Sequence, residues 1–175
     1  MFTPELETER LILRRFNSSD INLFHELISD KKINEFNYYP DTSIEYASKY
    51  INNIINNIDN NPYESWVIEI KDTHIPIGKI NVNNIYSRFN YCNVGYTLKY
   101  DYWGNGYAAE ALTKVTDHLL NDIKYHLVEC SIDDRNVGSI RVVEKAGFIK
   151  DGYINGRRPN GDGTYSGISY YSKSL

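Results

Sequence analysis

The stretch Tyr102-Trp103-Gly104-Asn105-Gly106-Tyr107-Ala108-Ala109-Glu110 joins the end of a predicted strand to the start of a predicted amphipathic helix. The first turn of a helix leaves about four backbone N–H groups without partners, and together with the helix dipole these groups favour an anion. The glycines would let the backbone approach such an anion closely. The spacing alone therefore predicts either a phosphate or pyrophosphate site or an ordinary glycine-rich connection.

Two other phosphate motifs fit this stretch poorly. No Lys-Ser or Lys-Thr follows the glycines, which excludes a Walker A loop. The spacing Gly104-x-Gly106-x-x-Ala109 does match a dinucleotide fingerprint, but that fingerprint requires the glycines to follow the strand directly, near the start of a domain. Here residues 99–103 separate the strand from the glycines, and the chain that follows is too short for a nucleotide-binding sheet. A nicotinamide-dependent enzyme is therefore disfavoured.

Outside this stretch, the hydrophobic pattern alternates between strands and helices. An apolar period of two predicts strands at residues 6–16, 66–70, 75–82, 91–98 and 127–132, and two short strands near Tyr153 and at residues 166–172. Helical spacing predicts one helix after the N-cap side chains of residues 17–20, a second after the capping box Thr42-x-x-Glu45, and two more at residues 106–121 and 137–146. We expect an α/β fold, a single domain over residues 1–175 whose mixed, mostly antiparallel sheet of about seven strands is flanked by about four helices.

The composition disfavours several classes of function. The 175 residues include 19 Lys and Arg against 23 Asp and Glu, and the net charge of −4 argues against nucleic-acid binding. No apolar run approaches the roughly 20 residues of a membrane span, and the start of the chain is acidic, unlike a signal peptide, so we expect a cytoplasmic protein without membrane partners. Cys92 and Cys130 are expected to be structural thiols, and the four His residues lack metal-ligand spacing, so no metal site is assigned.

Three ordered blocks of sequence carry a family resemblance. They are Asn93-Val94-Gly95-Tyr96-Thr97-Leu98, Tyr102-Trp103-Gly104-Asn105-Gly106-Tyr107-Ala108-x-Glu110-Ala111 and Asn136-x-x-Ser139-x-Arg141-Val142-x-Glu144-Lys145-Ala146-Gly147-Phe148. Together they resemble the GNAT acetyltransferases, and more narrowly the branch named for ribosomal-protein alanine N-acetyltransferases. The N-terminal Leu6-Glu7-Thr8-Glu9-Arg10-Leu11-x-Leu13-Arg14 also resembles the opening strand of that branch. The resemblance spans nearly the whole chain.

This resemblance implies acetyl-CoA as the cosubstrate and no metal. In the family, the backbone amides of an R/Q-x-x-G-x-G/A turn wrap the pyrophosphate, and Trp103 stands here where Arg or Gln is usual. The edge of the strand at residues 96–98 would pair with the pantetheine arm like an added strand. Asn136 would bond the same arm, or would serve only as a helix N-cap. The cofactor-binding residues implied are Tyr96, Thr97, Leu98, Trp103, Gly104, Asn105, Gly106, Tyr107, Ala108, Asn136 and Ser139.

The implied reaction is the direct attack of a primary amine on the thioester within a ternary complex, with backbone N–H groups at residues 96–98 as oxyanion donors. Many family members place an acidic Tyr seven residues after the helix-start Asn, and that position is Val143 here. The resemblance suggests Ser139 as the catalytic acid instead. The alternatives are that Ser139 only contacts the cofactor or only has a structural role in the first turn of the helix.

The general base is less determined by the sequence. Relatives often carry an acidic residue at the position of Asn93, whose amide accepts no proton. Glu129 is the candidate catalytic base and Glu69 the second one, each acting through water, unless both are solvent-facing strand residues. An α-amine has a pKa near 8, against about 10.4 for Lys, so a weak set of bases suits an N-terminal amine better.

The acceptor site is expected where the loop between the first two helices meets the C-terminal hairpin. Family members often show Arg-Tyr-x-Asp near the last strand, whereas this chain reads Thr164-Tyr165-Ser166-Gly167. The negative net charge suits a cationic acceptor. The candidate substrate-binding residues are Tyr38, Tyr39 and Tyr165, with Phe36, Tyr170 and Tyr171 beside them, unless these are core or surface aromatics.

The function expected is acetyl transfer from acetyl-CoA to a primary amine, on a peptide or protein N-terminus or on a small amine. The alternative is a module that binds acyl-CoA without transferring the acyl group. The expected partners are acetyl-CoA and the amine acceptor, and a homodimer is an option that no residue specifies.

Overall fold

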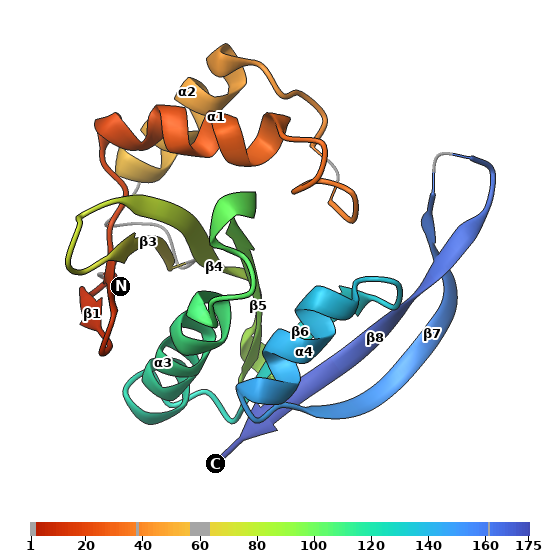
Figure 1. The fold of residues 1–175 in the computed structure, drawn as a ribbon. Coiled ribbons are helices and arrows are strands. Elements are labelled where there is room, and N and C mark those ends of the chain that lie inside the picture. Colours follow the sequence, from red (N-terminus) through yellow and green to blue (C-terminus); the bar gives the residue numbers. More distant parts are fainter. Residues whose placement is uncertain (1–2, 38, 57–63, 161) are drawn as a thin grey trace.

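The computed structural model describes residues 3–37, 39–56, 64–160 and 162–175, and it contains one eight-stranded sheet with four α-helices (Figure 1). The strands are β1 (Leu6–Glu7), β2 (Leu11–Arg14), β3 (Ser65–Ile70), β4 (Pro76–Tyr86), β5 (Tyr91–Leu98), β6 (Leu127–Asp133), β7 (Ile149–Pro159) and β8 (Tyr165–Ser174). The helices are α1 (Ile21–Ser29), α2 (Ile44–Asn56), α3 (Tyr107–Asn121) and α4 (Val137–Lys145). The strand order is β1-β2-β3-β4-β5-β6-β8-β7, and among these pairs only β5 and β6 run parallel.

The helices cover the sheet from both faces and form two cores (Figure 1). The larger core packs α3 and α4 against one face, and the smaller core packs α1 and α2 against the other. Successive side chains of β3 point to opposite faces of the sheet and so contribute to both cores. Trp66 and Ile68 belong to the larger core and Val67 to the smaller. None of the described helices has both the length and the apolar character that a membrane crossing requires.

The two central strands β5 and β6 separate after a short paired segment. Their register joins only Tyr91–Asn93 to Leu127–Glu129, whereas β4 continues to pair with β5 as far as Leu98 and β8 with β6 as far as Asp133. In the described part of the chain, the edge of β5 that faces β6 therefore has no strand partner beyond Asn93. Its free N–H and C=O groups can receive an extended ligand.

The predicted fold class is confirmed, and the structure corrects four details. The expected strand at residues 6–16 is two strands, because Thr8 forms a turn in which its hydroxyl accepts from the Leu11 N–H at 2.9 Å. The Thr42 capping box is wrong, since Ser43 Oγ accepts the N–H of Tyr46 at 3.1 Å. The sheet has eight strands rather than about seven, and β7 and β8 are longer than predicted.

Candidate functional site

A cavity of about 480 Å³ lies between the end of β5, the glycine-rich turn, the start of α3 and the first turns of α4. We call it the cofactor cavity. It brings together residues that are far apart in the sequence but that the resemblance implied as one site. All of the implied cofactor residues except Asn105 line it, namely Tyr96, Thr97, Leu98, Trp103, Gly104, Gly106, Tyr107, Ala108, Asn136 and Ser139.

The turn that precedes α3 requires its glycines. Gly104 and Gly106 have φ of +78° and +82°, a left-handed region that residues with a Cβ rarely adopt. A Cβ on Gly106 would lie 3.3 Å from Lys145 Nζ and 3.5 Å from Arg10 Nη2, so two cationic groups converge on this backbone position. Together with the free N–H groups of the α3 N-terminus, they form a cradle that fits an anionic pyrophosphate.

Trp103 stands where the family usually has Arg or Gln, and its side chain makes structural contacts. Its indole N–H donates to the Leu98 carbonyl at 2.9 Å, and its ring packs against Tyr100 with the centroids 5.1 Å apart. These contacts fix the turn to the end of β5. The substitution therefore preserves the position of the turn even though Trp supplies no cation.

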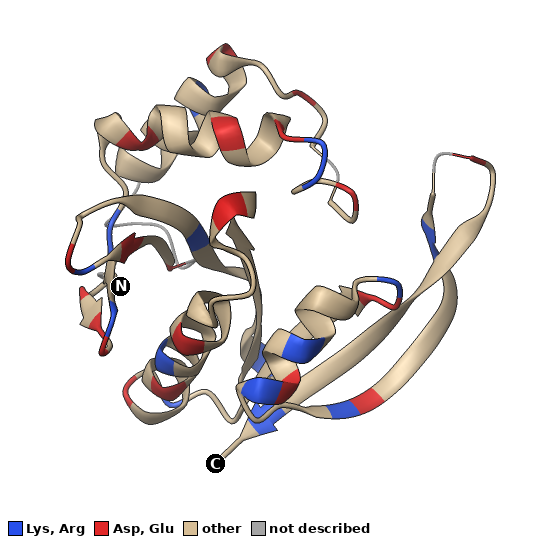
Figure 2. Ribbon diagram, in the orientation of Figure 1, with Lys and Arg blue, Asp and Glu red and all other residues tan. Residues whose placement is uncertain are grey.

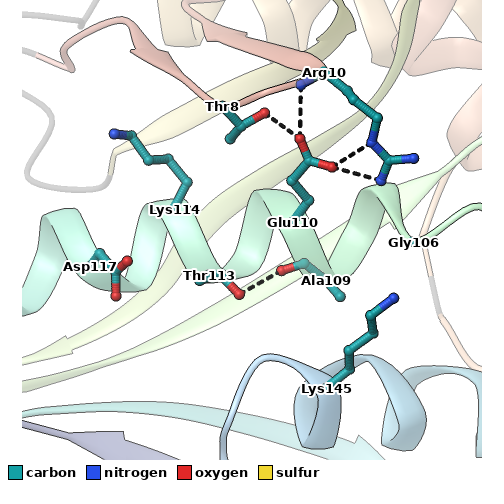
Figure 3. Close-up of a pocket in the computed structure, with 9 residues that line it drawn as sticks. All are labelled: Thr8, Arg10, Gly106, Ala109, Glu110, Thr113, Lys114, Asp117 and Lys145. Atoms are coloured by element: carbon teal, nitrogen blue, oxygen red, sulfur yellow. Dashed lines mark hydrogen bonds and ion pairs between the residues drawn. The ribbon is translucent and has the colours of Figure 1, made fainter.

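Arg10 and Glu110 join the N-terminal strands to α3 beside this turn (Figure 3). The Glu110 carboxylate accepts from Thr8 Oγ1 at 2.6 Å, from the Arg10 N–H at 3.0 Å and from Arg10 Nε at 2.7 Å. Burial alone would raise the pKa of Glu110, but the hydrogen bonds from Thr8 and Arg10 lower it below its ordinary value. Arg10 Nη1 also donates to the Asn105 carbonyl at 3.1 Å, so the cluster supports the turn itself. A shallow cavity of about 370 Å³ beside this cluster is further lined by Lys114, Asp117 and Lys145.

A second cavity of about 460 Å³ meets the first and opens toward β6 and the β7–β8 hairpin. We call it the acceptor cavity. Tyr96, Asn136 and Ser139 line both cavities, as do Phe36 and Asn37 from the loop between α1 and α2. The two cavities thus join at the site where β5 separates from β6.

The junction is organised around the start of α4. Asn136 Oδ1 accepts the Ser139 N–H at 3.0 Å and so caps the helix, and Tyr96 Oη donates to the Ser139 carbonyl at 3.1 Å. Burial raises the pKa of Tyr96, which keeps its hydroxyl protonated. The Ser139 side chain also hydrogen-bonds Tyr96, which acts to lower the pKa of Tyr96 against the larger effect of burial. Val143, at the family's Tyr position, is fully buried in the larger core and reaches neither cavity.

A chain of hydrogen bonds crosses β4, β5 and β6 beside the acceptor cavity. Lys79 Nζ donates to Asn81 at 2.7 Å, Asn81 to Asn83 at 2.5 Å, Asn83 to Asn93 at 3.1 Å and Asn93 to Glu129 at 3.0 Å. Every amide accepts on the Lys79 side and donates on the Glu129 side. The chain therefore runs from an ammonium to a carboxylate. Burial lowers the pKa of Lys79 to about 8.

The two candidate bases are held by other side chains. Glu129 accepts from Asn93 and lines neither cavity. Glu69 is bound by Arg14 and His74, at 2.5 and 2.8 Å. Burial acts to raise the pKa of Glu69, but these partners lower it below its ordinary value.

The candidate aromatic residues fall into different environments. Phe36 lines both cavities. Tyr39 packs edge-on against Phe24 and hydrogen-bonds Thr97, and burial raises its pKa to about 12. Tyr165 is 64% exposed at the start of β8 and lines neither cavity, and Tyr171 belongs to the larger core. Tyr38 lies outside the described residues.

Several site residues were missed in the sequence. Arg10 and Lys145 flank the glycine turn, and Asn83, Arg157 and Arg158 line the acceptor cavity. The adjacent arginines before the hairpin turn were a visible signal, whereas the others depend on distant contacts. No cluster of three His, Cys, Asp or Glu suited to a metal is found in the parts of the chain described above.

Comparison with known proteins identifies the family. A model described as an acetyltransferase (GNAT) domain matches residues 10–149. The N-acetyltransferase p20 of Bacillus licheniformis is 27% identical over 150 residues, covering 85% of this chain and 84% of that protein. A GNAT-family acetyltransferase from Bacillus anthracis superimposes with a TM-score of 0.83 at 22% identity over 98% of both chains. RimL, a ribosomal-protein α-N-acetyltransferase solved with coenzyme A, superimposes at 0.82 with 17% identity over 98% of both. The predicted family is confirmed, and this chain belongs to the GNAT acetyltransferases, a family of acyltransferase enzymes.

Proposed function

We propose that this enzyme transfers an acetyl group from acetyl-CoA to a primary amine by direct attack within a ternary complex. The observation that carries the proposal is the junction of two cavities at Tyr96, Asn136 and Ser139, where β5 separates from β6. A thioester held in one cavity would face an amine held in the other. Such alignment of two reactants supplies a large part of a rate enhancement.

The cofactor cavity suits the pyrophosphate, the pantetheine arm and the thioester of acetyl-CoA, which supplies the activated acyl group. The glycine turn, the α3 N-terminus, Arg10 and Lys145 would hold the pyrophosphate. The unpaired edge of β5 would hydrogen-bond the amides of the pantetheine arm, and its N–H groups at residues 96–98 would stabilise the developing oxyanion. The related RimL was solved with coenzyme A, which supports this assignment.

We assign Ser139 as the donor of a proton to the departing thiolate. Its side chain lies at the junction beside the Tyr96 hydroxyl, and the position of the family's Tyr is buried Val143. A thiol has a pKa near 8.5, so the thiolate leaves without a strong acid.

The assignment of Glu129 as the base stays a prediction, and it requires a bridging water because Glu129 lines neither cavity. Glu129→Gln tests it. If Glu129 is the base, the acidic limb of the pH profile of kcat/KM disappears. An unchanged limb would assign deprotonation to the solvent and to the acceptor's own pKa.

The transfer reaction is tested in two steps. Acetyl-CoA should raise the melting temperature of the protein and give a binding isotherm by calorimetry. A thiol-release screen over peptide N-termini and small amines should then detect turnover. Binding without release from any amine would favour the alternative, a module that holds acyl-CoA.

The two buried thiols, Cys92 and Cys130, suit a reducing compartment such as the cytoplasm.

A further inference from the structure

The acceptor cavity has an unusual charge for a protein whose net charge is −4. Its formally charged lining residues are one carboxylate, Asp133, and two guanidinium groups, Arg157 and Arg158. Figure 2 shows basic residues toward the end of β7, on the hairpin that borders this cavity. Whether the cavity attracts a cation or an anion depends on how far Asp133 is neutralised within the protein.

Asp133 is fully engaged by its own neighbours. Arg135 binds both of its carboxylate oxygens at 2.9 Å, and Ser166 Oγ donates to Oδ2 at 2.8 Å. Burial opposes ionisation, but the hydrogen bonds from Arg135 and Ser166 lower the pKa of Asp133 to about 2. The carboxylate is thus charged and already paired, and it leaves little attraction for an incoming ammonium group.

Arg157 and Arg158 have no such compensation. Across the described ranges, neither guanidinium has a hydrogen-bond or ion-pair partner, although Arg158 is half-buried. Arginine is the side chain best shaped to bind carboxylate or phosphate through two parallel hydrogen bonds. Two guanidinium groups without partners among the described residues, in one cavity of about 460 Å³, are therefore the groups that an anion subsite requires.

We propose that the acceptor amine carries an anionic group, a carboxylate or a phosphate, which Arg157 and Arg158 bind while the amine points to the junction at Tyr96 and Ser139. This inference rests on the proposed function, because it identifies the acceptor class of the same site. It replaces the expectation of a cationic acceptor, which rested on net charge alone. Polyamines carry additional positive charge into a cavity that already holds two unpaired arginines, so they are poor acceptors.

The test measures binding before turnover. With coenzyme A bound, calorimetry compares aminoalkyl carboxylates of increasing length with the matched amides, with aminoalkyl phosphates and with spermidine. The anionic member of a matched pair should bind about tenfold more tightly than the amide. A preference confined to carboxylates or to phosphates identifies which anion the site takes. Equal binding within every pair, or tightest binding of spermidine, would overturn the proposal.

Variants assign the preference to the two arginines. The double change Arg157→Gln, Arg158→Gln should remove the anion preference and leave the affinity for coenzyme A unchanged, whereas Arg88→Gln, on an exposed turn outside both cavities, should keep the preference. A preference that survives the double change would place the anion elsewhere and refute the subsite.

Thiol release on the same compounds separates the two proposals. Anion preference without release from any compound would leave the subsite standing and refute the transfer reaction. If thiol is released at the same rate with and without the anionic group, and the double arginine change has no effect on that rate, the transfer reaction stands and the anion subsite is refuted.

Discussion

At the level of single residues, Ser139 serves the site through three different groups. Its N–H is capped by Asn136, its carbonyl accepts from Tyr96, and its side chain lies at the junction of the cavities, where it also hydrogen-bonds Tyr96. The first two contacts use main-chain atoms, so Ser139→Ala removes the hydroxyl and leaves both contacts in place. The substitution therefore isolates the role of Oγ.

We expect Ser139→Ala to lower kcat about tenfold, less than the usual range for general acids because a thiolate leaves readily. The affinity for acetyl-CoA should change by less than about twofold. Stopped-flow thiol release and calorimetry measure the two quantities. Ser139→Thr, which keeps a hydroxyl, should recover part of kcat. An affinity loss with unchanged kcat would make Ser139 a cofactor contact instead.

At the level of elements, the turn before α3 determines where the pyrophosphate can bind. Gly106→Ala combines a strained left-handed backbone with a Cβ placed 3.3 Å from Lys145 Nζ. Gly104→Ala has nearly the same φ but no atom within 4 Å of its Cβ, so it is a matched control for strain. We expect Gly106→Ala to weaken acetyl-CoA binding about tenfold more than Gly104→Ala. Equal losses in calorimetry would show that strain alone matters and that the cradle contributes nothing.

The Arg10–Glu110 cluster fixes that turn to the N-terminal strands, and its contribution depends on pH. Since the folded-state pKa of Glu110 is lowered, its stabilisation is present above the unfolded value of about 4.5 and is lost as pH falls through the folded value. Glu110→Gln should lower the free energy of unfolding by about 1 kcal/mol at pH 7 and by almost nothing at acidic pH. The value at pH 7 is kept small because Arg10 is partly exposed to solvent. Urea unfolding at both pH values measures this. Exposed Glu5→Gln is the control, and a loss that persists in acid would contradict the ionic account.

Elements with a strong apolar period were predictable, whereas elements set by side-chain contacts were not. α3 and the meander of β3, β4 and β5 were predicted within a few residues because burial imposes their spacing. The break between β1 and β2 comes from the Thr8–Leu11 turn, which Thr8 and Arg10 also fasten to Glu110, and the distance in sequence hides the contacts with Glu110. The glycine turn was found because it needs a local backbone shape. Arg157 and Arg158 join the site only through the fold of the hairpin.

At the level of the whole molecule, the sheet separates two different environments. The face under α3 and α4 is mostly apolar, with the buried Glu64–His118 pair as an exception, while the opposite face of β4, β5 and β6 carries the hydrogen-bond relay from Lys79 to Glu129. Gly95 leaves space for this series of hydrogen-bonded side chains, because a Cβ there would lie 2.6 Å from Asn83 Nδ2. Burying an ammonium group at one end costs stability, a cost that proteins tolerate mainly near functional sites.

Lys79 provides the most direct measure of that cost. Its side chain is 7% exposed, lies over the Phe24 ring of α1 and has no carboxylate partner among the described residues. Burial lowers its pKa to about 8, against 10.5 for an ordinary lysine. The unfolded chain therefore binds more protons between these values, and the stability of the wild-type protein rises with pH across that interval.

Lys79→Met removes the ammonium group and keeps most of the apolar stem. At pH 7 the variant gains the avoided burial cost, about 3 kcal/mol from the shift in pKa, and loses the hydrogen bond to Asn81, about 1–2 kcal/mol. We expect its free energy of unfolding to exceed that of the wild type at pH 7, and the advantage to shrink by about 3 kcal/mol as pH rises from 8 through 10.5. Denaturant unfolding across this range measures the difference, in which all other titrations cancel. Lys31→Met, on an exposed turn, should give a flat difference. A flat difference for Lys79→Met as well would mean that Lys79 keeps an ordinary pKa because water or a counter-ion reaches it.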